Sequence, residues 1–87
     1  MKMAMTERQM IQEILNTVDV IYAFENVDED AKEYTLLVTQ QDNDNRPIEK
    51  VNAEIKKYFQ EADFNYKEEL NPTNTDKPAD IRVVIKR

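Results

Sequence analysis

The sequence predicts a small α+β domain whose elements follow the order αββαββ. Two segments space their apolar residues three and four positions apart, as amphipathic helices do, and four segments have the alternating or β-branched pattern of strands. Neighbouring strands are joined by turn-forming residues, so we expect hairpins, a four-stranded antiparallel sheet and both helices on one of its faces. A chain of 87 residues can hold one hydrophobic core, which predicts a single domain over residues 1–87 with residues 1–5 frayed.

The first helix is predicted over residues 6–17. Thr6 and Gln9 have the spacing of a capping box, in which each side chain accepts a hydrogen bond from the other residue's backbone. The apolar residues that follow at helical spacing, and therefore share one stripe, are Met10, Ile11, Ile14, Leu15 and Val18.

A strand is expected next, over residues 18–25, because β-branched and aromatic residues become frequent there. Its inward side would carry Val18, Val20, Tyr22 and Phe24. A second interpretation stays open at this stage, in which the helix continues through Tyr22, since Ile21 and Tyr22 also extend the helical stripe. In that case Val20 and Phe24 would face away from the core.

Polar residues 26–31 favour a turn, and a second strand is predicted over residues 33–41. The second helix is predicted over residues 46–62, with Pro47 in its first turn, where a missing backbone donor costs nothing. Its apolar stripe consists of Ile48, Val51, Ile55, Tyr58, Phe59 and Ala62.

Two further strands complete the pattern. The third is predicted over residues 63–70 and the fourth from Ile81 to the last residues, with a loop over residues 71–78 between them. This element order also results when the first strand of a ferredoxin-like βαββαβ fold is moved to the end. That arrangement would put the second and fourth strands, which are the most apolar, in the middle of the sheet, and it carries no functional implication.

Missing residue types exclude many kinds of enzyme site. The chain has no histidine, cysteine, serine, glycine or tryptophan, so it cannot build a serine or cysteine nucleophile, an imidazole base or a thiolate zinc site. Phosphate-binding loops that need glycine are excluded as well. We therefore expect a protein without enzymatic activity, cofactor or metal, and a carboxylate-dependent enzyme is a remote alternative.

Two local patterns favour structural interpretations. Asp42 and Asp44 have the spacing of the first two ligands of a calcium loop, but Pro47 stands where that loop needs glycine and Ala53 where it needs glutamate. The segment is instead predicted to be a polar turn that caps the second helix. The tyrosine and phenylalanine side chains fall on predicted inward faces, which favours core packing over base stacking.

Acidic residues gather in two segments of a chain whose formal net charge is −6. Residues 25–33 hold five acidic side chains and one lysine, and residues 61–80 hold six acidic side chains and two lysines. If the second helix runs back toward the first hairpin turn, the topology brings both segments side by side at one end of the molecule. The residues predicted to bind a partner at this acidic end are Glu25, Asp28, Glu29, Asp30, Glu33, Glu61 and Asp63. An acidic turn that is merely solvated would also explain the pattern.

The sheet face that the helices leave open is a second predicted surface. Strand alternation places Ile21, Leu37 and Val84 on it, with Ala23, Thr35 and Thr39 beside them. An uncovered apolar stripe of this kind would favour a homodimer, through this face or through an edge strand.

These patterns support one main hypothesis. A strongly acidic chain is repelled by phosphate backbones and anionic lipid, so we expect neither direct nucleic-acid binding nor membrane binding. We expect a cytoplasmic protein-interaction module that takes a basic protein as its partner. As a phage or mobile-element inhibitor it would occupy a target's basic nucleic-acid-binding site as a DNA mimic does. The alternative is a small homodimeric accessory protein.

Overall fold

The computed structural model describes residues 6–87, and its elements follow the predicted order. The segment 1–5, predicted to be frayed, lies outside the described residues. The elements are α1 (Glu7–Val18), β1 (Ile21–Asp28), β2 (Glu33–Thr39), α2 (Ile48–Glu61), β3 (Asn65–Leu70) and β4 (Ile81–Lys86).

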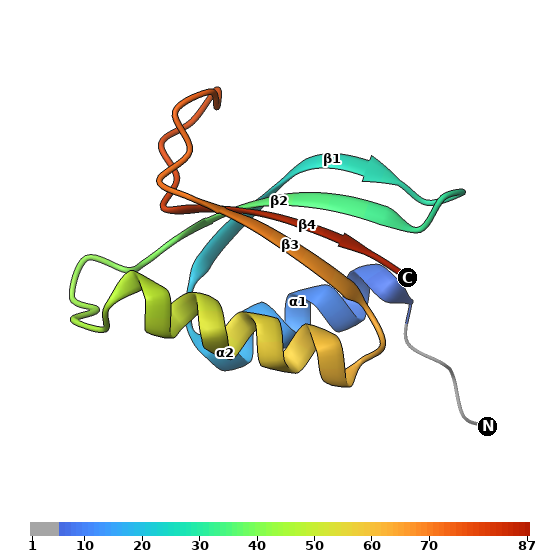
Figure 1. The fold of residues 1–87 in the computed structure, drawn as a ribbon, viewed down its shortest axis with the longest axis horizontal. Coiled ribbons are helices and arrows are strands. Elements are labelled where there is room, and N and C mark those ends of the chain that lie inside the picture. The colour runs from blue at the N-terminus through green and yellow to red at the C-terminus, as the bar shows by residue number, and fades with distance from the viewer. Residues whose placement is uncertain (1–5) are drawn as a thin grey trace.

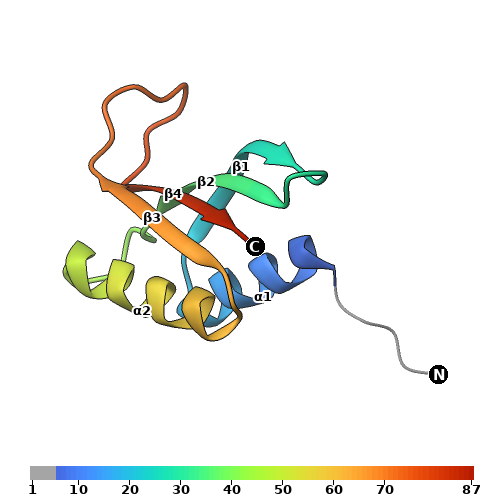
Figure 2. The same cartoon turned by 45° about the vertical axis from the view of Figure 1, so that its right-hand side comes forward.

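The strands form one antiparallel sheet in the order β1-β2-β4-β3. Both helices lie on the same face of this sheet, as Figures 1 and 2 show. The α+β class is therefore confirmed, and β2 and β4 occupy the middle, as in the rearranged ferredoxin-like order. β1 and β3 are the two edges.

The first helix begins with the predicted capping box and ends at Val18, the last residue of its apolar stripe and one residue beyond the predicted end. The Thr6 hydroxyl accepts a hydrogen bond from the Gln9 N–H at 3.1 Å, and the Gln9 side chain accepts one from the Thr6 N–H at 3.0 Å, which confirms the capping box. At the other end Asp19 adopts a left-handed conformation with φ 67° and ψ 54°. This residue reverses the chain after Val18, so the interpretation in which α1 continues through Tyr22 is wrong, and β1 starts at Ile21 rather than at residue 18.

A β-bulge in β1 keeps its apolar residues on the core face. The pairing with β2 shifts between Phe24 and Asn26, so Glu25 is the extra residue. In a regular strand Asn26 would follow Tyr22 and Phe24 onto the core face, and Val27 would point away from it. With the bulge, Tyr22, Phe24 and Val27 all pack against the core.

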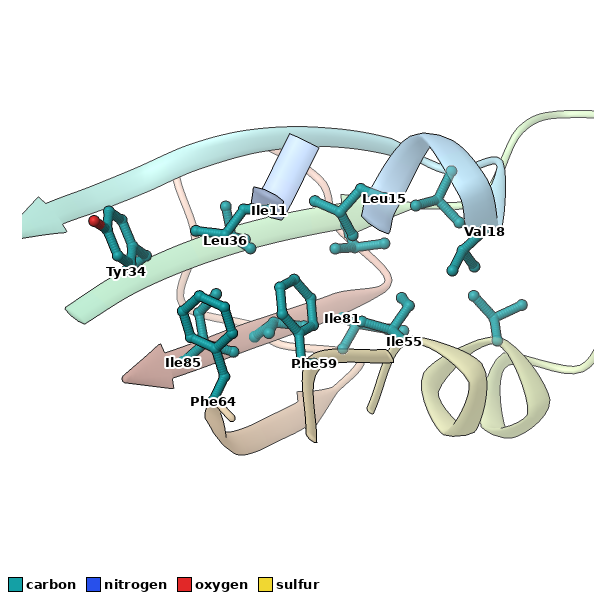
Figure 3. Close-up of a cluster of buried hydrophobic side chains, with 14 residues drawn as sticks. Ile11, Leu15, Val18, Tyr34, Leu36, Ile55, Phe59, Phe64, Ile81 and Ile85 are labelled. Carbon is teal, nitrogen blue, oxygen red and sulfur yellow. The ribbon is translucent and has the colours of Figure 1, made fainter. Parts of the chain in front are cut away.

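The core lies between the sheet and the two helices, and Figure 3 shows side chains from both layers meeting there. The Phe59 ring on α2 packs edge-on against Phe64 at a centroid distance of 5.5 Å and is stacked with Tyr66 at 6.0 Å. Tyr58 is 38% exposed, so the prediction that it faces inward is wrong. It adjoins Phe59 on the helix and falls at the margin of the apolar stripe.

The second helix starts later than predicted, at Ile48 rather than at residue 46. Pro47 precedes α2 in an extended conformation as its N-cap residue, and no side chain caps the helix there. The predicted capping turn is also wrong, because the Asp44 carboxylate accepts hydrogen bonds from the backbone N–H and the guanidinium of Arg46 instead.

Candidate interaction site

The predicted acidic end divides into two groups of carboxylates at the same end of the sheet. Asp28 of β1, Glu33 of β2, Lys86 of β4 and Asn65 of β3 are successive cross-strand partners and so form one row. The β1–β2 turn extends from one edge of this row, and the connection from α2 to β3 reaches the other edge. Three strand spacings, about 14 Å, separate the two edges. The expectation that Glu61 and Asp63 lie beside the turn is therefore wrong, because the turn joins β1 to β2 and β4 separates it from β3.

Basic side chains occupy the space between the two acidic groups. The Arg87 guanidinium lies 5.1 Å from the centre of the Phe64 ring and 3.4 Å from the Glu7 carboxylate, and the Arg87 N–H donates to the Lys32 carbonyl at 3.1 Å. Glu33 faces Lys86 across the strands. This end of the molecule therefore carries carboxylates at both edges, and at its centre each basic side chain faces a carboxylate-bearing residue.

The β1–β2 turn is the most acidic exposed segment in the described chain. Asp28, Glu29 and Asp30 are all exposed. The Asp28 carboxylate accepts the Ala31 N–H at 3.1 Å, which closes the turn, and Glu29 has one loose ion pair with Arg8 at 3.8 Å, both side chains being largely exposed. Exposed pairs of this kind contribute little, so these carboxylates stay available to a partner.

Glu25 belongs to a different surface from the rest of the predicted acidic end. Both its carboxylate oxygens accept hydrogen bonds from the Arg82 guanidinium, at 2.9 and 3.0 Å, on the open face of the sheet. Arg82 also contacts Glu69 at 3.3 Å and donates to the Asn74 carbonyl at 2.7 Å. The hydrogen bonds to Glu25 raise the pKa of Arg82 above its usual range. Sequence alternation puts Arg82 on this face but gives no sign of the loop carbonyl it binds.

The predicted apolar stripe on the open face is partly covered. The loop between β3 and β4 rises on this face, away from the helices (Figures 1 and 2). Leu37 is only 7% exposed, whereas Ile21 is 56% exposed and Val84 is half-buried. Leu37, expected on an uncovered apolar stripe, is therefore buried, whereas Ile21 is exposed. The open-face hollows that Leu37 lines are also lined by Lys77 of this loop.

Two polar networks hold neighbouring elements together. Arg46 donates to Asp44, to Glu54 at 2.9 Å and to the Val18 carbonyl at the end of α1 at 2.9 Å. The hydrogen bonds from Arg46 hold the pKa of Asp44 well below its usual range.

The second network joins α2 to β3. The Tyr66 hydroxyl donates to the Asn52 side chain at 2.6 Å, and Asn52 donates to Glu68 at 2.9 Å. Burial, with a smaller effect of the Glu68 charge, raises the pKa of Tyr66. The sequence pattern gives no sign of this chain of hydrogen bonds, because Asn52 is a polar residue within an otherwise apolar buried stripe. Among the described residues no group of three or more acidic side chains is arranged to hold a metal ion.

Comparison with family models, with curated proteins and with solved structures finds no match to this chain. In the described part of the chain no helix is long and apolar enough to cross a membrane.

Proposed function

We propose that the protein is a non-catalytic interaction module whose acidic β1–β2 turn binds a basic surface on a partner protein. The observation that carries this proposal is the exposure of Asp28, Glu29 and Asp30 with one loose ion pair among them. Oppositely charged surfaces attract over about 10 Å at 0.1 M salt, which accelerates association. The partner that fits best is a cytoplasmic nucleic-acid-binding protein, because its phosphate-binding site is basic.

Inhibition by occupation of that site, as in a phage or mobile-element inhibitor, follows from the same charge argument. The carboxylates gather in the turn and do not line a strand at alternate positions: the open-face positions of β1 hold Ile21, Ala23 and Asn26 before Asp28. Competition with nucleic acid would therefore depend on the charge gathered in the turn rather than on a copy of phosphate spacing.

The proposal is tested by capturing partners from a lysate at low salt and measuring their binding to a charge variant. The variant combines Asp28→Asn, Glu29→Gln and Asp30→Asn, and the amide oxygen introduced at position 28 can still accept the turn hydrogen bond. We expect about tenfold weaker binding, a slower association rate and a shallower salt dependence, because three exposed charges are lost. The captured partner should also release labelled DNA when the wild-type protein is added.

The matched control carries Glu13→Gln, Asp42→Asn and Glu49→Gln, which removes the same charge from exposed positions outside the turn. If both triple variants bind as well as the wild type, the turn is only a solvated surface and the proposal is wrong. If both lose affinity equally, net charge rather than the turn is responsible.

A further inference from the structure

β1 is an edge strand, and within residues 6–87 no backbone segment pairs with its outer side. Its first half, Ile21–Phe24, is regular, and the bulge at Glu25 follows. An unpaired edge presents N–H and C=O groups that an extended peptide can join as an additional strand. The regular half therefore offers backbone hydrogen bonds over about four residues.

A groove on the open face runs beside this half-strand. One part, of about 240 Å³, is lined by Ile21, Ala23, Leu37 and Thr39 of the sheet and by Lys77 and Pro78 of the β3–β4 loop. A second part, of about 130 Å³, shares Ala23, Leu37 and Lys77 and reaches Glu25 and Asp76. The two parts share three lining residues and therefore lie side by side, and the sheet wall of the first part is mostly apolar.

The wall of this groove is already fixed. The Asn71 N–H donates to the Asp80 carbonyl and the Asp80 N–H to the Val38 carbonyl, each at 2.8 Å, so the base of the loop is tied to the sheet. Higher up, the Arg82 guanidinium holds the Asn74 carbonyl. Because the loop is already held in place, binding of a ligand would not lose the conformational entropy of ordering it, and this favours binding.

The charges around β1 select the occupant. β1 carries Asp28 and Glu25, the latter paired with Arg82, and no basic residue, and the turn adds Glu29, Asp30 and Lys32. A second copy of β1 would bring only like charges together, which disfavours self-pairing. The other edge strand, β3, mixes Lys67 with Glu68 and Glu69 and so lacks this one-sided charge. Charge complementarity thus calls for a basic partner segment at β1.

We propose that the β1 edge and its groove bind an extended basic segment of a partner protein, paired antiparallel to β1. Its first residues would place basic side chains beside Asp28, and its later residues would place small apolar side chains in the groove near Ala23. Ala23 and Asp28 are five positions apart, about 16 Å along a strand. The inference rests on the proposed function, since it names the segment of the basic partner that docks.

The probe is the peptide Lys-Thr-Lys-Thr-Val-Thr-Val, and its control is the same sequence reversed, which keeps composition and charge. Amide chemical shifts of the wild-type protein are followed during titration. We expect the first peptide to shift the amides of Ile21–Phe24 and to bind at least fivefold more tightly than the reversed one. Equal affinity for both peptides, or shifts confined to the β1–β2 turn, would overturn the inference.

Ala23→Leu fills the groove without changing charge, and Thr35→Leu is the matched control on the same open face outside the groove. We expect Ala23→Leu to lower the affinity for the first peptide about tenfold, because the leucine occupies the space that an apolar side chain of the peptide would fill. We expect Thr35→Leu to leave the affinity unchanged. If Ala23→Leu binds the first peptide as tightly as the wild type does, the groove is not the binding site and the inference is wrong. The triple charge variant tests the proposed function independently of this result. If light scattering shows that the wild type is a dimer and that Ala23→Leu is a monomer, a second copy of the chain occupies the groove. That result would also refute the inference.

Discussion

At the scale of single residues, the fold builds left-handed backbone positions without glycine. The chain contains no glycine, and Asp19, Lys32, Asp63 and Asn71 all have φ between 52° and 67°. Asp and Asn tolerate this conformation because their short side chains can bond to the local backbone, whereas lysine has no such compensation. Lys32, in the β1–β2 turn, is therefore the most strained of the four.

Lys32→Gly should stabilise the protein by about 1 kcal/mol, because glycine adopts positive φ without steric cost. Urea unfolding followed by circular dichroism measures the change. Lys57→Gly is the control, since it removes the same charge from an exposed position of α2 and should cost about 1 kcal/mol there. Loss of stability in Lys32→Gly would show that the lysine side chain has a role beyond its backbone.

The Asp44 carboxylate gives stability a specific pH dependence. Its hydrogen bonds with Arg46 lower its pKa in the folded state, so its contribution is complete above the unfolded value of about 3.9 and is lost as pH falls below that value. Asp44→Asn should lower the melting temperature at pH 7, and the gap to wild type should narrow between pH 5 and pH 2. Asp42→Asn, at an exposed neighbouring position, is the control. If the difference in melting temperature between the wild type and Asp44→Asn stays constant down to pH 2, the ionised Asp44 carboxylate does not stabilise the fold.

At the scale of elements, the types and order of the helices and strands could be predicted because each depends on local periodicity. The end of α1 could not, since Ile21 and Tyr22 fit the helical stripe and only the left-handed turn at Asp19 separates them from it. The bulge at Glu25 is also a tertiary result: it forms so that Val27 reaches a core made by distant segments.

The path of the β3–β4 loop is a second feature that local pattern could not supply. Its residues are polar and contain two prolines, which indicates a loop but not a direction. Its position depends on contacts with residues far along the chain, such as the Asp80 carboxylate with the Gln40 N–H at 2.8 Å. The sequence therefore indicates the charge of a segment and the sheet face of a residue, while the groove and the separation of the two acidic groups depend on tertiary structure.

Leu37→Glu tests whether the loop buries the open face. Because Leu37 is 7% exposed, the substitution removes a packed side chain and places a charge under the loop, so it should cost more than about 3 kcal/mol. Ile21→Glu is the control on the same face, where 56% exposure predicts a change below about 1 kcal/mol. Thermal unfolding of both variants gives the comparison, and equal stabilities would mean that the loop does not cover Leu37.

At the scale of the whole molecule, exposed apolar side chains are few and dispersed. The exposed large apolar residues of the described chain are Ile21 at the start of β1, Tyr58 on α2 and Leu70 at the end of β3. Stable homodimers bury a contiguous surface of about 800 Å² or more per partner, usually with an apolar centre. Three isolated residues on three elements do not form such a centre, and a net charge of −6 adds repulsion between copies.

The protein should therefore be a monomer at tens of micromolar, in contrast to the homodimer considered from the sequence. Size-exclusion chromatography with light scattering measures the mass at 50 mM salt, where charges are weakly screened, and at 500 mM salt, where they are strongly screened. The Debye length, over which charges act, falls from about 10 Å at 0.1 M to about 3 Å at 1 M. If copies are kept apart by charge alone, a dimer will form at high salt, and Ile21→Glu will abolish it if β1 is the contact. A monomer at both salt concentrations means that burial of Leu37 by the β3–β4 loop has removed the apolar centre that self-association needs. A dimer at low salt, unaffected by Ile21→Glu, would show that another surface associates and that the charge argument fails.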